Sequence, residues 1–319
     1  FSNSTAASAL VRINSIYDLY QNVLGREGFD NESGHLDLVV NDFMWEGWSI
    51  DSGNAYSFTP FGSGTTLISV GSENEGAVDT LGHEYTHSVE TSISGMVSSG
   101  ESGALKEATS DIMGEISQDY FDDGQLDGDA DWIHGIRNLV DPSRSTQSER
   151  GDDKDAHPTR YQDDRWGNPS DDYDNGYVHN NSTVVGHAAY LMCNDTGLDG
   201  ESLDTEQMAL LVYGTFHALT SDSSFSQFRT CMELTARIMI EQGDLSSENL
   251  TRISAAFDAV NIRAADNNDF ISDDDEKKVE EAVTKIKGSR DVALVLDVSG
   301  SMDGEPIESM RAAATEFVS

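Results

Sequence analysis

Two histidines and a glutamate lie close together in the segment His83-Glu84-Tyr85-Thr86-His87. On a helix, positions i and i+4 share a face, so His83 and His87 can present two imidazole nitrogens to one zinc ion. Glu84 projects beside them, where its carboxylate could take a proton from a water molecule at the ion. The pattern therefore predicts a hydrolytic zinc site that needs no serine or cysteine nucleophile.

A catalytic zinc ion needs a third protein ligand and an open fourth position. Glu107, 24 positions after His83, is the candidate ligand. Asp111, one helical turn later, is placed to accept a hydrogen bond from the far nitrogen of a ligating histidine and so fix its tautomer. The alternative is that Glu107 and Asp111 belong to a solvated acidic face.

Hydrophobic periodicity predicts a helix for each motif. Apolar residues recur at helical spacing from Val78 to Ile93, and Gly95 is the stop signal. A second pattern opens after Gly103 and continues to Ile116, with the two carboxylates on one stripe. Two packed helices would bring all four groups to one point, which favours the metal site over the solvated face.

Three segments in this order resemble the thermolysin family of secreted zinc endopeptidases. They read GHEYTHSVE (82–90), GALKEATSDIMG (103–114) and DNGYVHN (174–180), and the spacing of 24 positions between His83 and Glu107 is also similar to the family's. The resemblance runs from about Ser8 to Ile262. It implies that His83, His87 and Glu107 bind zinc and that Glu84 is the general base, which also carries the proton to the leaving amine.

The resemblance also implies roles around the substrate. His179 matches the histidine that donates a hydrogen bond to the tetrahedral oxyanion, and Asp174 matches the carboxylate that orients it and keeps it protonated. Arg137 resembles the arginine that holds the substrate carbonyl. Asn54-Ala55 looks like the edge strand that pairs with the substrate backbone. Cleavage is expected before a bulky apolar residue, and Ile136 and Thr80 are candidate residues of its pocket.

The chain departs from the family pattern at several positions. Ser98 stands where the family has a tyrosine that donates to the oxyanion, and Lys106 stands where asparagine is common. Asp79 and Asp131 match two acidic positions of the double calcium site, so a weaker or single calcium is expected. Two further positions of that site are changed, to Gln118 and Ile133. A nearby acidic run would form either a replacement calcium loop or a solvated turn, and its residues are Asp122, Asp123, Asp127 and Asp129.

Composition limits the classes of partner. The chain has 319 residues, of which 19 are basic and 58 acidic, for a formal net charge of −39. Nucleic acid and anionic membrane surfaces are disfavoured by that charge. The sequence contains no run of 18 apolar residues, so no membrane span is predicted. The acidic excess suits an extracellular protein that binds divalent cations, and it equally suits life in high salt.

The remaining cysteines and histidines have structural explanations. Cys193 ends one predicted helix and Cys231 lies within another. The two cysteines would either form one disulfide or remain as buried free thiols. His187 lies on an apolar helical pattern and is predicted to be a satisfied core histidine. The other histidines lie outside any ligand spacing, although His134 is close enough to Arg137 to border the pocket; the rest are His35, His157 and His217.

The predicted fold class is α+β and two-lobed, with the zinc helix pair preceded by β structure at about 36–70. Residues 1–180 form the zinc-binding lobe, which lacks a β-rich segment expected upstream because the chain opens at Phe1. Residues 181–262 form a helical lobe, with helices at 184–192, 205–219, 226–242 and 247–260. Residues 263–287 are an acidic linker with an amphipathic helix, and 288–319 form a further α/β segment.

That last segment carries Asp297, Ser299 and Ser301 at the end of an apolar strand. The pattern resembles the start of a von Willebrand factor A domain, which implies part of a magnesium-type adhesion site and a module that binds another protein. One strand and one helix cannot bury both faces of the strand, so poor order is expected.

Two classes of function follow. The first is a secreted or cell-surface zinc endopeptidase that acts on polypeptides. The alternative is a catalytically impaired adhesion protein in which the peptidase-like part only displays a surface. The presence of Glu84, His179 and Asp174 together favours the enzyme, because an inactive protein has no chemical need for the base.

Overall fold

Helices α2 (Val78–Ile93) and α3 (Gly100–Phe121) pack against each other along their lengths and form the centre of the fold. In this computed structural model, the described residues are 3–40, 44–45, 48–49, 54–59, 64–71, 77–121, 124–145 and 157–284. They all belong to one compact unit that extends from Phe1 to Gly288. Both predicted zinc helices are present, and Gly95 follows the end of α2 with a left-handed φ of 60°.

Two glycines allow α2 and α3 to approach closely. A Cβ atom at Gly82 would lie 2.5 Å from the Ser117 hydroxyl, and one at Gly114 would lie 2.6 Å from the backbone oxygen of Asp79. Neither contact is sterically allowed, so a larger residue at either position would push the helices apart. This close packing brings the side chains of the two motifs to one point.

A helix and a three-stranded sheet pack on the α2 side. Strand β5 (Thr65–Val70) is central, parallel to β1 (His35–Val40) and antiparallel to β4 (Ala55–Phe58). Strands β4 and β5 contact α2, while α1 (Asn3–Asn22) contacts both α2 and α3. Because β4 lies at the sheet edge, its outer side is unpaired within this sheet. The smaller β elements are β2 (Met44–Trp45), β3 (Trp48–Ser49), β6 (Ile133–His134), β7 (Arg137–Asn138) and the 3-10 turn η1 (Pro142–Arg144).

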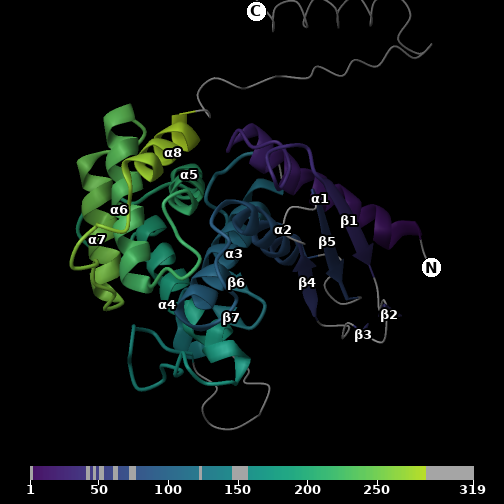
Figure 1. The fold of residues 1–319 in the computed structure, drawn as a ribbon, viewed down its shortest axis with the longest axis horizontal. Helices are drawn as coiled ribbons and strands as arrows, with labels where there is room; N and C mark the ends of the chain where they lie inside the picture. The colour runs from purple at the N-terminus through teal and green to yellow at the C-terminus, as the bar shows by residue number, and fades with distance from the viewer. Residues whose placement is uncertain are drawn as a thin grey trace, which may run out of the picture. The chain divides into compact units, whose positions relative to one another are not determined.

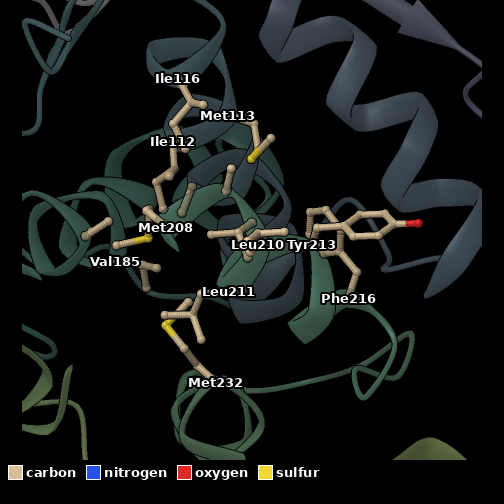
Figure 2. Close-up of a cluster of buried hydrophobic side chains, with 14 of the residues drawn as sticks. Ile112, Met113, Ile116, Val185, Met208, Leu210, Leu211, Tyr213, Phe216 and Met232 are labelled. Carbon is tan, nitrogen blue, oxygen red and sulfur yellow. The ribbon is translucent and has the colours of Figure 1, made fainter. Parts of the chain in front are cut away.

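The remaining helices are α4 (Asp174–Cys193), α5 (Thr205–Phe216), α6 (Phe225–Gln242), α7 (Ser247–Ala259) and α8 (Asp273–Thr284). Of these, α4, α5 and α6 pack on α3, while α7 packs on α4 and α6, and α8 packs on α5 and α6 (Figure 1). Three of them begin with reciprocal capping boxes at Asp204, Ser224 and Ser246. Figure 2 shows Ile112, Met113 and Ile116 of α3 packed with side chains of α4, α5 and α6 in the core. Buried apolar contacts thus anchor the helix that carries Glu107.

Most of the predicted helices and strands are present in the structure. The predicted helices of 184–262 correspond to α4–α7, and the amphipathic helix corresponds to α8, which packs on α5 and α6. Helix α1 was not predicted, and the expected boundary at 180/181 falls inside α4. Cys193 and Cys231 are free, so the disulfide alternative is wrong, and the Cys231 thiol instead donates to the Ala218 carbonyl at 3.3 Å.

The sequence-based expectation for Asp297, Ser299 and Ser301 lies outside the described residues. Among the residues that are described, none of the helices is both long and apolar enough to cross a membrane.

Candidate metal centre and active site

Helices α2 and α3 bring three potential metal ligands together. His83 Nε2 lies 3.3 Å from Glu107 Oε2, and His87 Nε2 lies 3.4 Å from Glu107 Oε1. Ligand atoms at the roughly 2.1 Å bond lengths of zinc sites lie about 3.4 Å apart at the corners of a tetrahedron. Both oxygens of the buried Glu107 thus face imidazole nitrogens. This donor set therefore fits a tetrahedral zinc ion.

A second layer of side chains orients both imidazoles. The Nδ1 atom of His83 lies 2.8 Å from Asp111 Oδ1, and the Nδ1 atom of His87 lies 3.0 Å from the Ser110 hydroxyl. These contacts occupy the far nitrogens and turn both Nε2 atoms toward Glu107. The predicted position of Asp111 behind His83 is present in the structure. Ser110 was not predicted, although its place next to Asp111, one turn after Glu107, was a usable signal.

Asp111 also binds Arg137, which β7 carries into the site. The guanidinium donates from Nε to Oδ2 at 2.6 Å and from Nη2 to Oδ1 at 2.7 Å. Although burial opposes ionisation, the charge of Arg137 and the hydrogen bond with His83 hold the pKa of Asp111 well below its usual range. Arg137 was predicted as a substrate contact, and the structure places its guanidinium on the carboxylate behind His83.

Glu84 is buried next to the edge strand of the sheet. Burial raises the pKa of its carboxyl to about 7, while a hydrogen bond with Ser57 of β4 partly opposes that shift. A carboxylate with this pKa is suited to exchange protons near neutral pH. The same strand begins with Ala55 after the exposed Asn54, so the predicted substrate strand lies beside the predicted base. Ser57 was not predicted, because nothing in the sequence links β4 to Glu84.

His179 and Asp174 sit at a strained entry to α4. Asp174 to Tyr177 all have positive φ, which is costly for residues other than glycine. The turn brings His179 Nδ1 to 2.6 Å from Asp174 Oδ1, and the other Asp174 oxygen accepts from the His179 backbone N–H at 2.9 Å. The free Nε2 then lies 3.2 Å from Glu107 Oε2. Burial opposes the charge, but Glu107 and Asp174 outweigh it and raise the pKa of His179 to about 10.

The residues that depart from the family pattern lie in different parts of the fold. Ser98 is exposed in the loop after α2. Lys106 contacts the buried Glu90 carboxylate at 3.5 Å and donates to the Thr91 hydroxyl at 3.1 Å. Asp131 is exposed and accepts from the backbone N–H of Ile133, and its charge, after burial, is among the causes that raise the pKa of the half-buried Asp79. His187, predicted to be satisfied, is 2.8 Å from the Leu139 carbonyl, as expected.

A pair of packed helices that offers two histidines and a glutamate to one point, with a buried glutamate beside them, is the arrangement of a mononuclear zinc hydrolase. The chain belongs to the thermolysin family of metallopeptidases. The family's catalytic-domain model matches residues 1–91, and its α-helical-domain model matches residues 94–262.

Characterised relatives agree with this assignment. The chain is 29% identical over 273 residues to thermolysin from Alicyclobacillus acidocaldarius, which covers 77% of this chain and 43% of that protein. It is 28% identical over 280 residues to bacillolysin from Brevibacillus brevis, covering 82% and 47%. The chain thus spans less than half the length of these relatives. The solved precursor of protealysin from Serratia proteamaculans shares the fold, with a TM-score of 0.63 at 22% identity over 82% of this chain and 79% of that one.

Proposed function

We propose that this chain is the catalytic part of a zinc-dependent endopeptidase that hydrolyses peptide bonds in polypeptides. The observation that carries this proposal is the spacing of 3.3 and 3.4 Å between Glu107 and the Nε2 atoms of His83 and His87, with Glu84 buried beside them. When bound, zinc supplies a Lewis acid that polarises the peptide carbonyl and lowers the pKa of water to about 7.

Glu84 would act as the base. With a pKa raised to about 7, its carboxylate can accept a proton from the attacking water and then deliver it to the leaving nitrogen. Proton transfer by a positioned side chain is worth roughly 10²–10⁴-fold in rate. Ser57 would hold the carboxyl group in place at the sheet edge.

His179 would stabilise the negative charge that develops on the carbonyl oxygen. Its Nε2 faces the site, and Asp174 holds Nδ1, so a protonated ring can donate one hydrogen bond inward. The side chain is 48% exposed, which leaves it accessible to a substrate. Arg137 would act mainly by fixing Asp111, and through it His83.

The substrate would lie along the free edge of β4. Asn54 and Ala55 would pair with its backbone by strand addition, next to Glu84. The position after the scissile bond would be a bulky apolar residue. Ile136, which is 38% exposed in the turn between β6 and β7, and the half-buried Thr80 are the candidate contacts for it.

The remaining attributes of the proposal concern location and other ions. The acidic composition and the family suit an extracellular enzyme, either free or held at a cell surface. For calcium, Asp79 and Asp131 offer carboxylate oxygens close enough for their charges to interact, which fits a weaker site than the six to eight oxygen ligands that this ion prefers, and Asp79 also faces His134. We also do not favour the impaired adhesion protein, since Glu84, His179 and Asp174 are all positioned for chemistry. A magnesium-binding module at residues 288–319 would be an additional tether of the enzyme.

The test is hydrolysis of an internally quenched peptide with Phe or Leu after the scissile bond, by the full-length protein with zinc added. The matched control is Glu84→Gln, which preserves shape and leaves the three ligands intact. We expect kcat/KM to fall by about 10²–10⁴-fold in the variant while zinc content stays at the wild-type level. A wild-type protein that binds zinc and cleaves no peptide would overturn the proposal.

A further inference from the structure

A second group of metal-binding side chains lies beside the first and shares none of its ligands. His134 Nδ1 of β6 is 3.6 Å from Asp79 Oδ2 in the first turn of α2, and 3.9 Å from Glu115 Oε1 in the middle of α3. One ligand atom from each residue lies within 4.8 Å of the other two. The two distances from His134 are wider than the edge of about 3.4 Å in a tetrahedral zinc site, so binding of an ion would draw the side chains together.

The polar atoms of this group lack partners. Glu115 is fully buried and His134 is 6% exposed. Both carboxylate oxygens of Glu115 and the Nδ1 atom of His134 have no hydrogen bond of ordinary geometry among the described residues. A buried polar atom left unpaired costs about 1–3 kcal/mol, and more when it is charged. Glu115 Oε1 and His134 Nδ1, which are 3.9 Å apart, therefore indicate a missing ligand between them.

The surroundings are negatively charged. Burial, followed by the carboxylates of Asp131, Asp79 and Asp111, raises the pKa of Glu115 to about 9, and a backbone contact from Trp132 only partly opposes this. The guanidinium of Arg137 does not neutralise the group, because Asp111 already holds it on two nitrogens. A bound dication would compensate these charges and allow Glu115 to ionise.

His134 is oriented as a metal ligand. Its Nε2 atom lies 3.7 Å from Asp111 Oδ1, and its ring stacks on that of His83 with centroids 4.8 Å apart. A proton on Nε2, facing Asp111, leaves the lone pair of Nδ1 directed at Asp79 and Glu115.

Close helix packing makes the group possible. At Gly114, a Cβ atom would lie 2.6 Å from the Asp79 backbone oxygen and 3.4 Å from His134 Nδ1. The glycine therefore leaves the room in which the three side chains converge.

We propose that Asp79, Glu115 and His134 bind a second divalent ion of the transition-metal type, such as zinc or manganese. The ligand set is one imidazole and two carboxylates, which suits these ions, whereas calcium requires six to eight oxygen ligands. Asp111 lies between the two sites, with Oδ1 near both His83 and His134. The second ion would therefore add positive charge close to the carboxylate that orients His83.

The experiment measures metal content rather than hydrolysis. The chain is stripped with a chelator and dialysed to equilibrium against zinc, manganese or calcium alone, and bound metal is counted by mass spectrometry. We expect two equivalents of zinc in the wild type, and one in Glu115→Gln and in His134→Gln. His87→Ala, which removes a ligand of the first site, is the matched control and should also retain one.

The contrary results are well defined. A single zinc equivalent in the wild type overturns the proposal, and so does a second equivalent that survives in both cluster variants. A second site filled only by calcium, and insensitive to His134→Gln, also overturns it. Circular dichroism establishes that each variant is folded. If a cluster variant does not fold, the visible spectrum of cobalt bound to His87→Ala decides, because its absence means that no second site exists. A chain that holds two zinc ions and cleaves nothing would refute only the proposed function.

Discussion

Replacing Asp111 by asparagine is the most informative single perturbation of the site. The carboxylate accepts from Arg137 at 2.6 and 2.7 Å and lies 2.8 Å from His83 Nδ1. Asparagine has the same shape, but it is neutral and presents an N–H group to partners that are themselves donors. The change therefore removes the charge on which two buried groups depend, without creating a cavity.

The expected magnitude follows from the burial of the pair. Breaking a buried ion pair on one side costs about 3–5 kcal/mol, because the other charge is left uncompensated. The Arg137 side chain keeps slight solvent contact, so we expect a loss near 3 kcal/mol in the free energy of unfolding. Loss of a carboxylate that orients a metal-binding histidine typically weakens metal affinity by about 10–100-fold. Zinc binding should weaken by that factor.

Two measurements test this reasoning separately. Urea unfolding in the presence of a chelator gives the stability of the chain alone, and competition with a chromophoric chelator gives the zinc affinity. Asp199→Asn is the control, because Asp199 is exposed and surface substitutions usually change stability by less than about 0.5 kcal/mol. A loss below about 1 kcal/mol in Asp111→Asn, together with unchanged zinc affinity, would refute the assigned role of this carboxylate.

Two further predictions concern the turn before α4 and the contact between the zinc helices. His179→Gln should lower kcat by about 10²–10³-fold, because one donor to the oxyanion is weakened, while zinc content stays constant; an undiminished kcat would remove His179 from the mechanism. Gly114→Ala should lower the free energy of unfolding by about 1–3 kcal/mol in a urea titration, because its Cβ would lie 2.6 Å from the Asp79 backbone oxygen. A stability equal to that of the wild type would mean that the helices separate without strain.

Local features of the sequence were sufficient to predict the centre of the site. The i, i+4 spacing of His83 and His87 fixes their common face on any helix, whatever packs around it. Helix α6 was also predicted because its helical pattern is encoded within a single segment. Helix α1 was missed, although its apolar residues recur at helical spacing and several are buried, including Ile13, Ile16 and Leu19.

The order of segments determined the family, while contacts between segments were decided only by the tertiary structure. Arg137 was predicted as a substrate contact, yet it is bound to Asp111, 26 residues earlier. Glu115 follows Asp111 by one helical turn and so shared its stripe, but its role depends on His134 of β6. No periodicity encodes such a pairing, because it arises from the way that β6 packs on α3.

The sequence by itself therefore determined which side chains could bind a catalytic zinc ion and which helices carry them. The tertiary structure decided which groups surround those side chains: Ser57 beside Glu84, Ser110 behind His87, and the second acidic cluster around His134. The physical reason is the range of the interactions. Helical spacing is set by local backbone geometry, whereas burial, unpaired polar atoms and shifted pKa values exist only after distant segments have packed together.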